Sequence, residues 1–346
     1  MSKTKKIWII SASIAVAVGI IIAMLVDITT DFALFQEHNV ITEVKTYSVD
    51  KEFKNIKVED VEYDVFLVPT KDEKCKVVCN EGEKLYHTVE VVGDTLTIKR
   101  INTRKWYESI YFGFSFGGWD SLKMTVYLPE KEYQDLYITT TSGDVLVEAP
   151  FKFSETKVYN TSGDVILSNI TADNITATST SGEVQISSSN VKENLDLRTT
   201  SGDVSLSDVT AKNITSESTS GEVQVISANV KDELYSGTTS GDVNISNVKT
   251  QDVSVKSTSG DVELIGVISL GDLKAKTVSG EIDLDRCDGK FLNLETTSGD
   301  VDGSLLREKL FITDTTSGEV NVPIFTSDEK CMISTVSGDI EIVVLK

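Results

Sequence analysis

Apolar and polar residues alternate along most of the chain after residue 138, and Ser-Gly followed by Asp or Glu interrupts the alternation at regular intervals. Val or Ile stands two residues after the glycine of every copy, and an aliphatic residue stands four residues after it in all copies but one, where Gly303 takes the position. This pattern predicts a short β-strand with one buried face. The eleven glycines are spaced 19 or 20 residues apart: Gly143, Gly163, Gly182, Gly202, Gly221, Gly241, Gly260, Gly280, Gly299, Gly318 and Gly338.

A second strand is predicted before each glycine, because the positions five and seven residues upstream are often apolar, as at Leu195 and Leu197. The Ser-Gly between the two strands is expected to be a corner where glycine adopts a positive φ. A polar return such as Thr210–Asn213 then leads to the next copy.

A fixed period of this length is typical of a solenoid, in which each coil buries its apolar face only by stacking on its neighbours. We therefore predict an all-β, single-chain parallel β-helix (β-solenoid) of 19–20 residues per coil over residues 138–346. Right-handed crossovers dominate for parallel strands, so a right-handed coil is expected. Residues 160–199 and 199–238 match closely, which indicates duplication of a two-coil unit.

The N-terminus predicts a membrane anchor. A basic leader at 1–6 precedes twenty uncharged residues at 7–26, which are long enough to cross a bilayer as one helix. The basic leader favours a cytoplasmic N-terminus, with the rest of the chain outside the cytoplasm. A cleaved signal peptide is the alternative, but the run has no small-residue exit. Residues 27–46 are interpreted as a tether.

Residues 47–137 continue the strand pattern without the Ser-Gly-acid motif. We interpret them as irregular coils that begin the solenoid and cap its open edge. Gly93-Asp94 predicts a hairpin or corner between two of these strands. A separate small β domain is the alternative interpretation.

The chain is strongly acidic, with 54 Asp and Glu residues against 33 Lys and Arg residues and a net charge of −21. Such a charge repels nucleic acid, so nucleic-acid binding is excluded as a main role, whereas cations or a basic partner would be attracted. The four cysteines are interpreted as buried free thiols, since Cys75 and Cys79 lie about 13 Å apart on one strand. Only two histidines and no zinc-ligand spacing are present, so a histidine metal site is not expected.

The acid after each glycine would form a column along stacked coils. Hydroxyl or amide donors at the corner could stabilise each carboxylate, which is the structural interpretation. The alternative is a ladder of calcium ions, although Asp and Glu interchange freely along the column. The candidate ligands are Asp144, Asp164, Glu183, Asp203, Glu222, Asp242 and Asp261.

Thr or Ser usually occupies the two positions before the Ser-Gly, as at Thr199 and Thr200. A flat threonine array could order water, as in ice-binding solenoids. Val278 and Val336 interrupt the array, and adjacent residues on a strand point to opposite faces. Stacked hydroxyl ladders at the corner are the preferred interpretation.

An aromatic, glycine-rich segment is the best candidate for a partner-binding site, because exposed aromatic patches mark contact surfaces. Packing within the N-terminal cap is the equal alternative. The residues are Trp106, Tyr107, Tyr111, Phe112, Phe114, Phe116 and Trp119.

Several features together resemble a family of bacterial β-strand-repeat proteins known as candidate adhesins. They are the basic leader and single span, the strand at 53–58, Gly-Asp-Thr-Leu-Thr-Ile at 93–98, Val-Tyr-Leu-Pro at 126–129 and the Thr-Ser-Gly-Asp-Val repeats. The resemblance covers residues 47–346. It implies a membrane-anchored β-solenoid, brings no catalytic residues, and, through relatives encoded beside envelope-stress regulators, implies a role in the cell envelope.

We therefore predict a non-enzymatic, single-pass membrane protein that presents an acidic rod for adhesion or for envelope-stress sensing, with no cofactor. A membrane protein or a cell-wall or surface polymer is the expected partner. The first alternative is a polysaccharide-acting β-helix lyase or hydrolase, which would need a unique carboxylate cluster that breaks the repeat. The second is a structural rod that binds cations.

Overall fold

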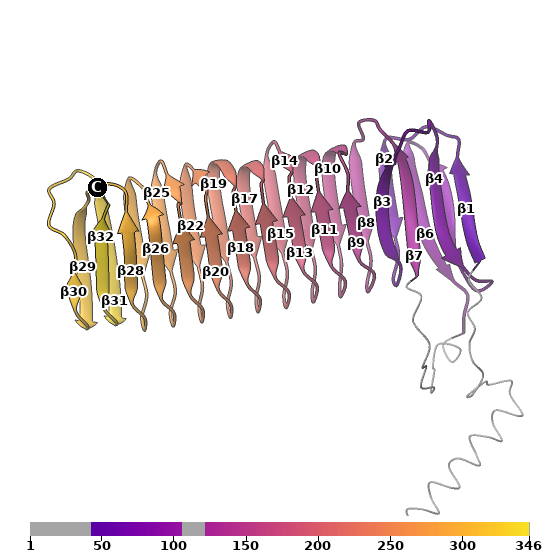
Figure 1. The fold of residues 1–346 in the computed structure, drawn as a ribbon. Helices are drawn as coiled ribbons and strands as arrows, with labels where there is room; N and C mark the ends of the chain where they lie inside the picture. Colours follow the sequence, from indigo (N-terminus) through magenta and orange to yellow (C-terminus); the bar gives the residue numbers. More distant parts are fainter. Residues whose placement is uncertain (1–42, 106–121, 346) are drawn as a thin grey trace, which may run out of the picture. The chain divides into compact units, whose positions relative to one another are not determined.

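The computed structural model describes residues 43–105 and 122–345, which form β-strands and no helix (Figure 1). The predicted leader and span at 1–26 and the tether up to residue 42 lie outside these residues. The last four residues predicted as tether, 43–46, belong to β1 (Glu43–Val49). Where the chain is described, it contains no helix that is long and apolar enough to span a membrane.

The chain divides into two compact units. Most of the first unit lies outside the described residues, and the second contains the stacked coils. The first comprises Met1–Val44, Glu81–Tyr86 and Ile101–Ser121, and the second comprises Lys45–Asn80, His87–Arg100 and Leu122–Lys346.

The strands form two sheets. The first has the spatial order β1, β4 (Cys75–Glu81), β7 (Lys123–Pro129), β3 (Asp64–Thr70), β9 (Val145–Glu148), β11 (Val165–Ser168), β13 (Val184–Ser187), β16 (Val204–Ser207), β18 (Val223–Ile226), β20 (Val243–Ser246), β23 (Val262–Ile265), β26 (Ile282–Cys287), β28 (Val301–Leu305), β32 (Ile340–Val344) and β30 (Val320–Asn321). The second contains β2 (Asn55–Glu59), β5 (Leu85–Val92), β6 (Thr95–Asn102), β8 (Asp135–Thr139), β10 (Lys152–Tyr159), β12 (Thr171–Thr178), β14 (Asn190–Val191), β15 (Asn194–Arg198), β17 (Thr210–Glu217), β19 (Asn229–Gly237), β21 (Lys249–Thr250), β22 (Asp252–Lys256), β24 (Ile268–Ser269), β25 (Asp272–Lys276), β27 (Phe291–Glu295), β29 (Leu310–Ser317) and β31 (Lys330–Ser337).

Successive coils pair in parallel and in register, which confirms the predicted parallel solenoid. Val165 on β11 pairs with Val184 on β13, and Val184 pairs with Val204 on β16. These valines are fully buried, as are Leu195 and Leu197 on the facing sheet. Alternating side chains of the two sheets therefore meet in one continuous apolar core.

The repeated glycines do not adopt the positive φ that the sequence predicted. Among the described glycines, only Gly93, Gly266 and Gly303 have a positive φ. The repeated glycines are required for a different reason, because a Cβ at any of the eleven would lie only 1.9 to 2.3 Å from a backbone oxygen of the neighbouring coil. Close backbone approach between coils, rather than a left-handed turn, explains the motif.

The left-handed turn lies instead six residues after the glycine. Seven successive coils have φ values between 48° and 62° at this position, and six of these seven residues are not glycine. Asn, Asp and Ser predominate, and Asn and Asp tolerate this conformation better than most residues. The positions are Asn169, Ser188, Asp208, Ser227, Asn247, Gly266 and Arg286.

At both ends of the stack the spatial order of coils departs from the sequence order. The coil of β2 and β3 pairs with β8 and β9 on one side and with β6 and β7 on the other. At the C-terminal end, β31 and β32 lie between β27 and β28 on one side and β29 and β30 on the other (Figure 1). The first and last coils are therefore each enclosed between two neighbours, so neither can fray from the end of the stack.

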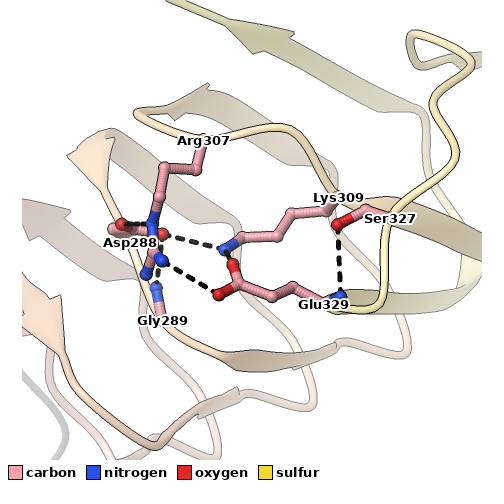
Figure 2. A network of polar contacts seen from close by, with 6 residues as sticks. All are labelled: Asp288, Gly289, Arg307, Lys309, Ser327 and Glu329. Carbon is pink, nitrogen blue, oxygen red and sulfur yellow. Dashed lines mark hydrogen bonds and ion pairs between the residues drawn. The ribbon is translucent and has the colours of Figure 1, made fainter.

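An ion-pair network around a buried lysine, here called the clasp, holds the C-terminal connection that skips a coil. Lys309 is fully buried and lies between Asp288, 2.9 Å away, and Glu329 (Figure 2). Arg307 pairs with the same two carboxylates. These four residues come from three segments, before β27, between β28 and β29, and before β31, so the clasp ties the interleaved coils together.

The N-terminal coils also contain a buried polar pair. Nε2 of His87 lies 2.7 Å from Asp60, whose other carboxylate oxygen accepts the backbone amides of Val61, Glu62 and Tyr63. Burial raises the pKa of Asp60, but the hydrogen bonds from His87 and the amides outweigh it, so this pKa lies below its ordinary value. The pair fixes the corner that precedes β3.

All four cysteines are free and buried, as predicted. Burial raises the pKa of Cys75 and Cys331 to about 12 and that of Cys287 to about 11. These three thiols therefore stay protonated at neutral pH and act as small apolar side chains.

Candidate functional site: a polar groove across the coils

The aromatic segment proposed from the sequence lies outside the described residues. Its members are Trp106, Tyr107, Tyr111, Phe112, Phe114, Phe116 and Trp119. Both interpretations of it, a contact surface and cap packing, stay predictions.

The acidic column is bonded to the coil corners wherever the acid is an aspartate followed by another coil. Oδ1 of Asp164 accepts the backbone amide of Glu183 at 2.8 Å, and Oδ1 of Asp203 accepts that of Glu222 at the same distance. The same bond recurs at Asp144, Asp242, Asp261, Asp300 and Asp339. The longer glutamates do not make it, which gives the aspartates a structural role at the corner.

The glutamates of the column lie beside like charges. Partial burial, followed by the neighbouring carboxylates of Asp164 and Asp203, raises the pKa of Glu183. Within residues 43–105 and 122–345, no three of these carboxylates bring their oxygens within 4.8 Å of one another. The column thus has no preformed multidentate calcium cage, and the calcium ladder stays a prediction for experiment.

The two Thr or Ser columns have different roles. The inner column, three residues before the glycine, is buried in the regular coils, and most of its hydroxyls donate to the glycine carbonyl of the previous coil, as Thr199 does to Gly182 at 3.0 Å and Thr238 to Gly221 at 2.9 Å. This is the hydroxyl ladder expected from the sequence. The outer column, two residues before each glycine, includes Thr200 and Thr239 and is exposed.

A groove of about 530 Å³ runs along the outer threonine column and crosses several coils. Its floor and walls combine exposed hydroxyls with a small set of charged and aromatic side chains, and all of them belong to the second unit. The residues are Thr178, Ser179, Thr180, Arg198, Thr199, Thr200, Glu217, Ser218, Thr219, Tyr235, Gly237, Thr238, Thr239 and Lys256.

One coil that lines the groove contains a break in the repeat. Gly237 occupies the outward position that Arg198, Glu217 and Lys256 fill in other coils, so the wall lacks a side chain there. The phenol of Tyr235 lies over this gap, because a Cβ on Gly237 would be 3.0 Å from its Oη. The half-buried Tyr235 ring therefore forms part of the floor of the groove.

The two cations that line the groove differ in their partners. Arg198 pairs with Asp196 at 2.8 Å and with Glu217. The Lys256 ammonium lies 5.8 Å from the centre of the Tyr235 ring, and no carboxylate in the described part of the chain pairs with it. The groove thus offers one unpaired cation on an otherwise acidic molecule.

The sequence indicates this site by a departure from the repeat, which the positions shared by all coils do not reveal. In the two-coil alignment, Tyr235 replaces Asp196 and Gly237 replaces Arg198, so two outward positions change together. Periodicity identifies residues that all coils share, whereas the groove depends on residues that one coil does not share.

The family model of Toastrack DUF4097 matches residues 53–246 and 226–346, which together span most of the chain. The chain belongs to this family. The resemblance to β-strand-repeat proteins is thereby confirmed. Among curated proteins, none matches this Toastrack chain.

Several solved structures are similar to this Toastrack chain. A candidate adhesin of Parabacteroides merdae is 16% identical, with 78% of this chain and 98% of that one covered and a TM-score of 0.46. A candidate lipid-binding protein of Parabacteroides distasonis is 17% identical, with coverages of 87% and 97% and a TM-score of 0.44. A candidate cell adhesion protein of Clostridium sporogenes is 13% identical, with coverages of 88% and 100% and a TM-score of 0.20.

Proposed function

We propose that this Toastrack chain is a non-enzymatic protein of the bacterial cell envelope, anchored by residues 7–26, that presents its coils outside the cytoplasm as a rigid binding surface. Adhesion to a surface polymer is the role that we favour over envelope-stress sensing. The observation that carries the proposal is the groove lined by Tyr235 and Gly237, where one coil departs from the repeat and an aromatic ring is placed beside exposed hydroxyls.

The arrangement of carboxylates supports a non-enzymatic role. Glycoside hydrolysis needs two acids in different environments on opposite sides of one bond. The aspartates of the column instead repeat from coil to coil and accept backbone amides. In the groove, the acid Glu217 is paired with Arg198.

Two measurements test the proposal. Protease treatment of intact cells that carry the full-length protein should digest the solenoid and leave the N-terminal leader protected. Cells with the protein should adhere to a polysaccharide-coated surface, and a double variant, Tyr235→Ala with Lys256→Ala, should adhere less at equal surface amounts. A solenoid protected from protease, or adhesion that does not depend on the protein, would contradict the proposal.

The sensing role and the enzymatic alternative are distinguished by separate measurements. Crosslinking in membranes should capture one membrane protein if the chain is a sensor, and replacement of Trp106, Tyr111, Phe112, Phe114 and Trp119 by Ser should abolish the capture. Release of reducing sugars from a polysaccharide by the purified protein would overturn the non-enzymatic assignment.

A further inference from the structure

The side chains that line the groove indicate which kind of polymer it binds. The outer threonines Thr180, Thr200, Thr219 and Thr239 line it, one from each coil, and no hydrogen bond within the described residues uses their hydroxyls. Adjacent coils are about 4.8 Å apart, so these hydroxyls form a row with that repeat. A ligand that fits the row must itself be extended and carry hydrogen-bonding groups at a similar repeat.

An extended polysaccharide meets this requirement, since each sugar ring advances the chain by a comparable length and presents hydroxyls that both donate and accept. Threonine hydroxyls can do the same, so register along the groove need not be strict. The Tyr235 ring adds a flat surface with an apolar body and a polar tip, against which the C–H face of a sugar ring can pack.

The charge of the groove distinguishes one class of polysaccharide. Arg198 is neutralised by Asp196 and Glu217, but Lys256 has no carboxylate partner in the described part of the chain. The Lys256 ammonium stands beside Tyr235, where a ligand carboxylate could reach it. The net charge of −21 repels every polyanion, so the attraction for a ligand carboxylate must come from the local ammonium of Lys256 and not from the charge of the whole molecule.

We propose that the groove binds a segment of an acidic glycan, with a uronate carboxylate on Lys256, a sugar ring on Tyr235 and successive sugar hydroxyls on the outer threonines. This inference rests on the proposed role in polymer binding and names the chemistry of the polymer.

Calorimetric titration of the full-length protein in detergent tests it, with a hexameric oligouronate as the probe. The same hexamer with its carboxylates reduced to alcohols is the second probe. The oligouronate should bind more tightly than the reduced hexamer, and the difference in oligouronate affinity between the wild type and Lys256→Met should shrink as salt is added. Lys256→Met should weaken oligouronate binding about fivefold, as for a solvent-accessible ion pair, and leave the reduced hexamer unaffected. Tyr235→Leu should weaken both about tenfold.

Lys276→Met is the matched control. Lys276 occupies the same outward position one coil further on, but it is paired with Glu295 at 2.8 Å and does not line the groove. This variant should bind the oligouronate within about twofold of the wild type. Unfolding temperatures confirm that each variant is folded, and Thr219→Val, which removes one exposed hydroxyl, provides a variant that does not alter the strands.

Absence of oligouronate binding by the wild type would overturn the inference, as would equal binding of both probes or equal effects of Lys256→Met and Lys276→Met. If oligouronate binding is absent while cells still adhere through the protein, the acidic-glycan inference fails and the proposed function stands. If adhesion is absent as well, both fail.

Discussion

At the scale of the residue, side chains of the repeat serve the contact between coils. The glycine lets two backbones approach, the inner hydroxyl donates to the glycine carbonyl of the previous coil, and the aspartate accepts an amide of the next. The hydroxyl and the aspartate each satisfy a backbone group that stacking would otherwise leave unpaired at a corner. The motif is therefore a device for joining coils.

Gly202→Ala tests this account. Its Cβ would lie 2.1 Å from the carbonyl oxygen of Gly182, so we expect a loss of unfolding free energy of about 3 kcal/mol from overpacking against rigid backbone. Gly266→Asn is the control, because φ is +62° there and Asn247 holds the same conformation one coil earlier. It should change stability by no more than about 0.5 kcal/mol. Chemical denaturation measures both, and similar effects of the two substitutions would contradict the role of close approach.

The aspartates of the column give a second prediction. Asp203→Ala removes the acceptor of the Glu222 amide at 2.8 Å and should cost about 1 kcal/mol. Glu183→Gln should leave the unfolding free energy unchanged, because partial burial and the neighbouring carboxylates of Asp164 and Asp203 disfavour a negative charge at this position. If the carboxylates serve the corners, adding calcium or a chelator should leave the unfolding temperature of the wild type unchanged. A rise with calcium that Asp203→Ala abolishes would instead establish the cation ladder.

At the scale of the element, strand pairing at the ends of the stack is decided by connections that skip a coil. The clasp shows how the C-terminal connection is fixed: Lys309 is fully buried and contacts carboxylates from two other segments (Figure 2). A buried charge is tolerated only when it is paired, so the network specifies which segments meet.

Lys309→Met should therefore destabilise β29 to β32 by about 3 kcal/mol, because Asp288 and Glu329 would lose the buried cation between them. Hydrogen exchange of the C-terminal strands measures the effect. Lys276→Met, which removes a solvent-exposed ion pair with Glu295, should change the free energy of opening measured by hydrogen exchange by less than about 1 kcal/mol. Unchanged protection of β29 to β32 in Lys309→Met would show that core packing alone holds the interleaved coils.

At the scale of the whole molecule, the regular coils behave as interchangeable units, since each contacts its neighbours through the same bonds. The coils near the two ends of the stack are not interchangeable. There the first and the last coil in sequence lie inside the stack, each between two neighbouring coils. Length can thus vary in the middle of the solenoid while both ends stay protected.

Deletion of residues 161–199 tests this modularity. It removes two coils and joins Asn160 to Thr200, so that Gly202 takes the place of Gly163 above Gly143. The shortened protein should fold, with a solenoid about 10 Å shorter by small-angle scattering. Deletion of residues 161–190, which is not a whole number of coils, should prevent cooperative unfolding. If both deletions unfold the protein, the coils are not modular.

The alternation of Val, Ile and Leu with polar residues and the 19–20-residue period determined the strands, the parallel stack and the aspartate corners. These could be predicted because local alternation fixes which face is buried, and regular repetition leads equivalent residues to stack. The same pattern misled about Gly202 and its equivalents, since a close approach between backbones and a left-handed turn both select glycine.

Only the tertiary structure decided the interleaving of the end coils, the burial of Lys309 and the groove around Tyr235. Each depends on which coil becomes the neighbour of another, and that choice rests on contacts between residues far apart in sequence. A repeated sequence offers many equivalent pairings, so its period cannot specify one. The residues that do not repeat determine the pairing, and their roles can be recognised only once the fold brings them together. Asp288, Lys309 and Glu329 meet in this way at the clasp, and Tyr235, Gly237 and Lys256 meet in the groove.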